Sequence, residues 1–256
     1  MKLTPNMLNL ALAPILRGPI AIILLASGIL SGAPMPAQAG VFSVTPVRIY
    51  MTPRDRAVAV TITNEGDAEV VLQADLNAWS QKPDGTDEQV PTEDLILSPP
   101  ILKLAPNARQ VVRLALLKPA DASRQLIYRM IIREVPEAAP ARDKTMQMPI
   151  ALALSMPVFI TPPPAKREIN CQAAPGAAQA LNVTCTNSGT AYAQVREILV
   201  KRGTQTLAKF EGGTYILPGA RQIMSAKGEQ ALSPGPAQLN VGFDDGRVQT
   251  FDLTLP

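Results

Sequence analysis

Histidine is absent from all 256 residues of the chain. Without it, the Ser-His-Asp and Cys-His arrangements of nucleophilic catalysis cannot form, and the commonest zinc ligand is missing. Carboxylate-only or lysine-based catalysis needs no histidine, but the sequence holds no paired acidic motif that resembles it. We therefore predict that the protein is not an enzyme and that it has no catalytic residue, metal or cofactor.

The sequence also lacks an excess of charge of one sign. It has 24 Lys and Arg residues against 21 Asp and Glu residues, and the basic residues form no block. Proteins that bind nucleic acid normally concentrate their basic residues in a patch or stripe. The composition therefore argues against nucleic acid as a partner.

Long hydrophobic runs are limited to the N-terminus, where Pro19–Leu30 precedes the small-x-small pattern Ala37-Gln38-Ala39. With basic residues before this run, the order predicts a cleavable signal peptide over residues 1–39. The run is too short to span a bilayer stably. Translation from an internal methionine such as Met7 would shorten this long leader. We expect an exported protein that starts at Gly40 and has no stable membrane insertion.

Cysteine is scarce, and its two copies, Cys171 and Cys185, lie close together. Both stand in strand-like segments, and Pro175-Gly176 between them indicates a turn. In an exported protein, such a pair predicts a disulfide bond that ties two neighbouring strands. A redox or metal role would need a closer pair or additional ligands.

What the sequence does contain is a series of short strand-like runs separated by turn signals, without a long helical pattern. The expected strands are Val41–Tyr50, Ala57–Asn64, Val70–Trp79, Gln110–Leu117, Leu126–Val135, Met146–Thr161, Leu181–Thr186, Gln194–Lys201, Thr206–Phe210, Gln222–Ser225, Gln238–Phe243 and Val248–Leu255. This density of short strands is typical of immunoglobulin-like sandwiches. We predict an all-β protein with two such domains.

The predicted domain boundary falls at a run of three prolines, Pro162-Pro163-Pro164, which stiffens and extends the chain. We expect an N-terminal immunoglobulin-like domain over residues 40–161, a proline hinge over residues 162–165 and a C-terminal immunoglobulin-like domain over residues 166–256.

The stretch Met146–Ile160 alternates more regularly than any other. Successive strand residues point to opposite faces, so the pattern predicts one long strand with an apolar row on one face. The row consists of Met146, Met148, Ile150, Leu152, Leu154, Met156, Val158 and Ile160. The other face is small, polar or proline except at Phe159, and its two prolines argue against a central strand. A long apolar edge strand favours aggregation, so we expect it to pair with another chain. The alternative is that the row packs into the core of its own domain.

Four short motifs, in three stretches of the sequence, resemble the PapD-like periplasmic chaperones of the chaperone–usher pilus pathway. They are the Pro-Pro turn and the turn after it in Ser98–Pro106, the V-R-[IL] strand in Gln110–Leu114, and the R-E-[IV]-P strand end in Tyr128–Pro136. They occur in the family's order and at similar spacing, and the resemblance covers essentially the whole mature chain. It implies two immunoglobulin-like domains in a bent, boomerang-like arrangement and a location in the periplasm.

The resemblance also implies a function without catalysis. A PapD-like chaperone lends a long strand to a pilus or fimbrial subunit that lacks its last strand, and delivers the subunit to an outer-membrane usher. This donor-strand complementation would use Met148, Ile150 and Leu152, with Met146 and Leu154 extending the row. The usher-binding surface of the family includes the Pro-Pro turn and therefore Pro99.

A basic pair anchors the subunit's C-terminal carboxylate in this family, and its arginine corresponds to Arg48. A guanidinium can hold a carboxylate with two parallel hydrogen bonds. The family's lysine falls on Pro157 or Met156 here, which departs from the pattern. The anchor would then use Lys166 or Arg167, or Arg48 alone.

A further implication is a structural ion-pair network between the domains. Arg113 and Glu134 match two of its members, and Asp244 or Asp245 would be the third. Removing one member would leave a partly buried charge unpaired.

Two other functional classes remain as alternatives. The chain could be an exported pilus or surface-adhesion subunit, but strand signals begin soon after the cleavage site and both domains look complete. It could be an adhesive binding module, but Trp79 is its only tryptophan and no exposed aromatic cluster stands out. For a chaperone, an unpaired apolar strand also favours self-association of the free protein.

Overall fold

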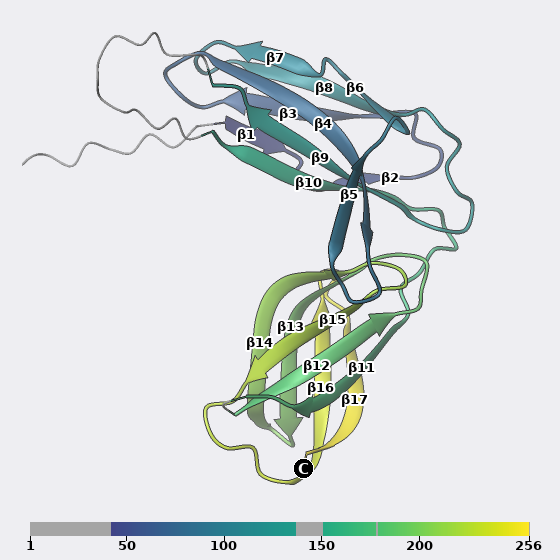
Figure 1. Cartoon of the computed structure of the whole chain (residues 1–256), viewed down its shortest axis with the longest axis vertical. Helices are drawn as coiled ribbons and strands as arrows, with labels where there is room; N and C mark the ends of the chain where they lie inside the picture. Colours follow the sequence, from purple (N-terminus) through teal and green to yellow (C-terminus); the bar gives the residue numbers. More distant parts are fainter. Residues whose placement is uncertain (1–41, 137–150, 178, 256) are drawn as a thin grey trace, which may run out of the picture. The chain divides into compact units, whose positions relative to one another are not determined.

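A computed structural model describes residues 42–136, 151–177 and 179–255 of the chain. These residues form β-strands joined by turns, without a helix, and therefore without a helix that could cross a membrane (Figure 1). The all-β prediction is confirmed. The predicted signal peptide lies outside the described residues.

The strands of the first sandwich belong to two sheets that enclose one hydrophobic core. One sheet has the order β1-β3-β8-β6; the other has the order β2-β10-β9-β4-β5, with β7 paired to β4. Their bounds are β1 (Phe42–Thr45), β2 (Ile49–Met51), β3 (Ala57–Asn64), β4 (Val70–Gln81), β5 (Asp87–Pro91), β6 (Leu95–Ser98), β7 (Ile101–Leu104), β8 (Arg109–Leu116), β9 (Leu126–Glu134) and β10 (Ala153–Ile160). Every second residue of β9 faces this core, namely Tyr128, Met130 and Ile132.

The first strand differs from its prediction. The sequence predicts one strand over Val41–Tyr50, whereas the structure has two, which pair in different sheets. Strand β1 pairs with β3, and β2 pairs with β10 in parallel. Pro46 follows β1 and has no N–H group to donate to a ladder, so the chain leaves one sheet there and enters the other.

A second sandwich contains a single hydrogen-bonded series in the order β11-β12-β15-β14-β13-β16-β17 (Figure 1). Its strands are β11 (Ile169–Pro175), β12 (Ala180–Asn187), β13 (Ala193–Arg202), β14 (Gln205–Ile216), β15 (Arg221–Lys227), β16 (Gly235–Phe243) and β17 (Val248–Leu255). It encloses its own hydrophobic core. The two cores lie on either side of Pro162-Pro163-Pro164 in the sequence, where the hinge is predicted.

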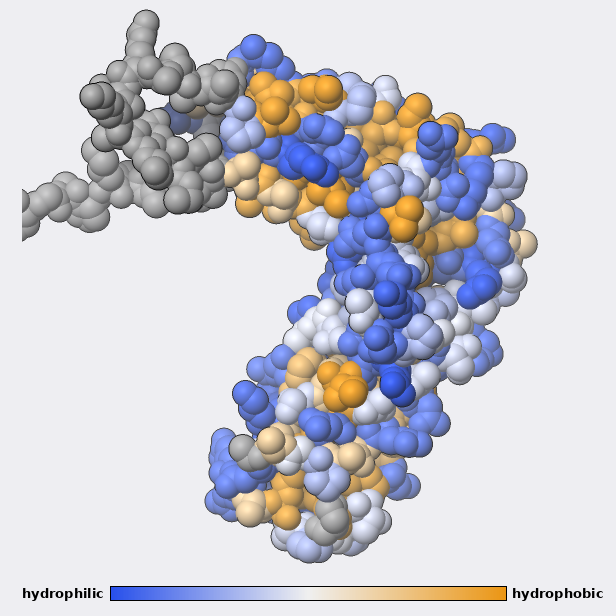
Figure 2. All heavy atoms as spheres, viewed as in Figure 1, coloured by the Kyte–Doolittle hydropathy of each residue, from blue (hydrophilic) through white to orange (hydrophobic). Residues whose placement is uncertain are grey.

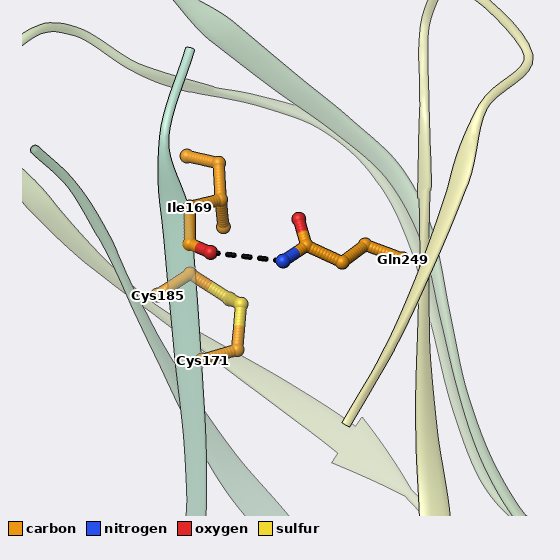
Figure 3. The surroundings of a disulfide bond; sticks show 4 residues. All are labelled: Ile169, Cys171, Cys185 and Gln249. Carbon is orange, nitrogen blue, oxygen red and sulfur yellow. Dashed lines mark hydrogen bonds between the residues drawn. A yellow bond between two sulfur atoms is a disulfide. The ribbon is translucent and has the colours of Figure 1, made fainter. Parts of the chain in front are cut away.

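The predicted disulfide is present between Cys171 on β11 and Cys185 on β12. The two residues face each other across neighbouring antiparallel strands, with 4.1 Å between their Cα atoms, and both are buried. Gln249 of β17 donates a hydrogen bond to the Ile169 carbonyl close to this bridge (Figure 3). The bridge therefore ties the edge strand β11 to the core of its sandwich.

Candidate functional site

Strand β10 has one edge that is only partly covered. On one side it pairs with β9 along its whole length, from Ala153 to Ile160. On the other side it pairs with the short strand β2, over Val158–Ile160 alone. Among the described residues, no strand pairs with the outer edge of β10 from Ala153 to Pro157. This segment therefore presents unpaired backbone groups to a further strand.

The apolar row changes its surroundings along β10. Met156, Val158 and Ile160 are buried in the core of the first sandwich, as the alternative reading predicts. Leu152 and Leu154 are only half-buried and pack at the margin of the same core. Met146, Met148 and Ile150, the other predicted donor residues, lie outside the described residues. The row is thus core at one end and partly open where the strand edge is free.

Phe159, the exception on the opposite face of β10, belongs to an aromatic cluster. Its ring stacks on Tyr192 with 3.9 Å between centroids and on Tyr50 at 5.7 Å. Trp79 meets Tyr215 edge-on at 5.2 Å. Because Tyr192 and Tyr215 belong to the second sandwich, this cluster connects the outer face of the first sandwich to it.

Arg48 lies in the bend just before β2 and is bound within the chain. One Nη atom is 3.2 Å from the Asp244 carboxylate, which also accepts a hydrogen bond from the Tyr192 hydroxyl at 2.9 Å. Burial raises the pKa of Tyr192, with contributions from Tyr50 and Asp244, so its hydroxyl stays protonated and donates. About a third of the Arg48 side chain remains exposed (31%), so the side chain is not fully enclosed by Asp244 and its other neighbours.

Arg129, on β9, is a cation that the sequence reasoning missed. Its guanidinium carbon lies 3.6 Å from the centre of the Trp79 ring and 5.6 Å from that of Tyr215. Its Nε atom is buried and has no hydrogen-bond partner, and the side chain forms no ion pair in the described part of the chain. Burial lowers the pKa of Arg129, although a guanidinium stays charged in proteins.

The position of Arg129 in the sheet relates it to the missing lysine. Antiparallel pairing sets Arg129 directly opposite Pro157, one of the two positions where the resemblance expects that lysine. A pattern search along the donor strand cannot find a residue on its neighbour. The sequence signal was the Tyr128-Arg129 pair within the stretch Tyr128–Pro136, but only the strand register connects it to Pro157.

The two basic residues suggested as substitutes for that lysine have other partners. Lys166 lies 2.9 Å from Glu168. Arg167 makes two hydrogen bonds to Asp245, at 2.9 and 3.1 Å, and its guanidinium lies over the Phe243 ring. Neither is the free cation that the anchor requires.

The predicted network of Arg113, Glu134 and Asp244 is not formed, and this expectation is corrected. Asp244 is bound by Arg48 and Tyr192, and Asp245 by Arg167. Arg113 is exposed on β8, since its neighbours on that strand take the core positions. One carboxylate oxygen of Glu134 is buried without a hydrogen-bond partner, and no ion pair involves either residue in the described ranges.

Pro99, the expected usher contact, lies between β6 and β7 and is half-buried. Several large apolar side chains are exposed on the first sandwich, including Ile96 of β6 and Ile101 of β7. Figure 2 shows apolar residues gathered on part of this sandwich, while hydrophilic residues cover the hairpin that contains β5.

Comparison with known proteins decides the family. Residues 41–166 match the family described as the pili and flagellar-assembly chaperone, PapD N-terminal domain. The chain belongs to the PapD-like family of pilus-assembly chaperones. Members of this family are not enzymes, which confirms the exclusion of catalysis, and they are periplasmic. No curated protein matches the sequence.

Solved structures of PapD-like chaperones have the same fold. One is the chaperone–tip subunit pre-assembly complex CsuC–CsuE from Csu pili of Acinetobacter baumannii, whose matched chain is 17% identical. The match has a TM-score of 0.60 and covers 83% of this chain and 97% of that chain. The E. coli chaperone DraB is 18% identical with a TM-score of 0.55, covering 84% and 96%. The SafA pilin–SafB chaperone complex of Salmonella enterica gives 15% identity and a TM-score of 0.55, covering 85% and 98%.

Proposed function

We propose that this PapD-like protein is a periplasmic chaperone that binds pilus or fimbrial subunits by donor-strand complementation and delivers them to an outer-membrane usher. The observation that carries the proposal is the outer edge of β10. That edge is unpaired from Ala153 to Pro157 in the described residues, and the apolar side chains of Leu152 and Leu154 are only half-buried there.

The topology favours one direction for an added strand. Strand β2 occupies the same edge of β10 further along and runs parallel to β10. A parallel strand added from Ala153 onwards would lie in line with β2, and its C-terminal end would meet the bend that contains Arg48. Extending the register by one residue aligns Arg48 with Pro157. We therefore propose that Arg48 anchors the terminal carboxylate of the bound subunit.

The apolar row supplies the binding free energy in this proposal. A fully buried aliphatic side chain contributes roughly 1.5–3 kcal/mol. Five donor residues would contribute about 7–15 kcal/mol before the costs of ordering two chains are subtracted. The donor residues are Met146, Met148, Ile150, Leu152 and Leu154.

Charged substitutions along β10 test the proposal. In Leu152→Glu the charge can stay in water in the free protein, because Leu152 is half-buried beside an open edge. In the complex the charge would be buried without a partner, at a cost of several kcal/mol. We expect the free variant to keep nearly the wild-type melting temperature while recovery of a co-produced fimbrial subunit is lost.

Val158→Glu is the matched control, because Val158 belongs to the same row and is completely buried in the core. This variant should unfold the free protein. If Leu152→Glu unfolds the free protein to the same degree, the row is ordinary core and the donor-strand proposal fails. Full recovery of the subunit by Leu152→Glu would also contradict it.

A further inference from the structure

We infer that Arg129 supplies a second cationic contact for the carboxylate of the bound strand, beside Arg48. The inference rests on the proposed function and identifies a residue of the same site. It starts from the guanidinium of Arg129, which has aromatic contacts but forms no ion pair in the described chain.

The sheet register brings the two arginines to either side of one residue. Arg129 is the antiparallel partner of Pro157 on β9, and Arg48 lies one residue before the parallel pair of Ile49 with Val158. Their backbones are therefore two strand spacings apart, roughly 10 Å. Both charges act on Tyr215, which lies within electrostatic range of each. Pro157 has neither a charged group nor a backbone N–H, so it does not compete for a carboxylate bound near the two arginines.

The surroundings of Arg129 are suited to binding a carboxylate. Its Nε donor is buried and unsatisfied, and native proteins leave few such groups without a reason. The ring of Trp79 at 3.6 Å holds the guanidinium plane, so little side-chain freedom is lost when a ligand arrives. A carboxylate bound at this guanidinium would accept charge-assisted hydrogen bonds from it.

Arg48 alone is a weaker receptor, because its charge is already shared. The Asp244 carboxylate lies 3.2 Å from it and would repel a second carboxylate bound at the same guanidinium. The charge of Asp87 acts on Arg129, but the two form no ion pair, and Asp87 already accepts hydrogen bonds from the Trp79 indole and the Gln81 amide. Arg129 therefore offers a guanidinium to which no carboxylate of the described chain is bound directly.

The experiment compares subunit recovery by variants of the full chain. Each is co-produced in the periplasm with a fimbrial subunit, and the complex is purified. Arg129→Gln should reduce recovery roughly 10- to 100-fold, as expected for a lost charge-assisted bond. Arg129→Lys, which keeps the charge, should restore part of it. Arg133→Gln is the matched control: Arg133 lies on the same face of β9, is exposed and pairs with Asp75. It should bind as wild type does.

Trp79 gives a second readout, because it is the only tryptophan and touches the Arg129 guanidinium. The free protein is titrated with a peptide of the subunit's last twelve residues, once as the acid and once as the C-terminal amide. The acid should change Trp79 emission and the amide should not, and Arg129→Gln should abolish the response to the acid. A purely structural role of Arg129 predicts no difference between acid and amide.

The two proposals fail in different ways. If wild-type protein recovers no subunit, the proposed chaperone function fails. If wild type recovers subunit and Arg129→Gln recovers as much, the function stands and the role of Arg129 is overturned. Equal responses of Trp79 to the acid and the amide also overturn it. Should Arg129→Gln fold poorly, Arg129→Lys and the peptide titration of wild-type protein decide the question.

Discussion

Asp244 is the residue on which the charge balance of the site depends. Its carboxylate accepts a hydrogen bond from the Tyr192 hydroxyl at 2.9 Å and lies 3.2 Å from the Arg48 guanidinium. Only 11% of the Asp244 side chain is exposed. Asp244 therefore competes with the subunit's terminal carboxylate for Arg48. At the same time it connects the end of β16 to the bend before β2.

Asp244→Asn separates these two roles, because the amide keeps the shape and removes the charge. The free protein should lose about 1 kcal/mol of stability, since a partly exposed ion pair contributes little. Subunit recovery should rise, because Arg48 is no longer shared. Arg48→Ala should instead abolish recovery while the protein stays folded. Thermal unfolding and co-purification measure both effects. Equal losses of recovery in Asp244→Asn and Arg48→Ala would mean that Asp244 positions Arg48 rather than competing for it.

At the scale of elements, the disulfide joins the neighbouring strands β11 and β12, which contribute no residue to the proposed site. In the chain-entropy model, closing a loop of this size stabilises the fold by about 3 kcal/mol. The double variant Cys171→Ala, Cys185→Ala should lose about this much in denaturant unfolding followed by circular dichroism. Subunit recovery at low temperature should be unchanged. A variant that unfolds at the wild-type midpoint would show that the bridge adds no stability.

The strands were predictable from sequence where alternation alone determines which face is buried. Strand β10 shows both the strength and the limit of this reasoning: alternation identified its apolar row, and turn residues identified most strand ends. Alternation could not say which part of the row is core, because that depends on how far β2 covers the edge of β10. Sequence reasoning missed the role of Arg129 for a similar reason, because only the register between β9 and β10 sets Arg129 opposite Pro157.

Non-local contacts also explain the corrected ion-pair network. The family pattern predicted a network of Asp244 with Arg113 and Glu134, whereas in the structure Asp244 forms its ion pair with Arg48. Sequence spacing carries no information on which of several arginines approaches a given carboxylate. Phe159, by contrast, was visible as an exception on the polar face, and its burial among aromatic rings accounts for it.

At the scale of the whole molecule, the hairpin of β4 and β5 connects the first sandwich to the second. The Gln81 amide accepts a hydrogen bond from the Leu217 N–H at 2.9 Å and donates one to the Tyr215 carbonyl at 3.2 Å. At the hairpin tip, the Gln222 side chain donates to the Gly85 carbonyl at 2.7 Å. The hairpin therefore holds the backbone of Tyr215, a residue on which both arginines act electrostatically.

Gly85→Ala should loosen this connection. Gly85 has a φ of +90°, and a Cβ there would lie 2.3 Å from the Arg221 carbonyl oxygen, so backbone must move. Gly203→Ala is the control, because Gly203 also has a positive φ, of 60°, but a Cβ there meets nothing within 4 Å. The control should cost about 1–2 kcal/mol of conformational strain, and Gly85→Ala should cost more.

The two variants should also differ in function. Displacing the hairpin moves Asp87, which accepts a hydrogen bond from the Trp79 indole at 3.0 Å, and disturbs the ring that holds Arg129. Trp79 emission and subunit recovery should therefore change in Gly85→Ala and stay as in wild type in Gly203→Ala. If both variants recover subunit equally well, the hairpin contact is not needed to hold the carboxylate site together, and the site depends on the aromatic cluster and the Arg48–Asp244 pair alone.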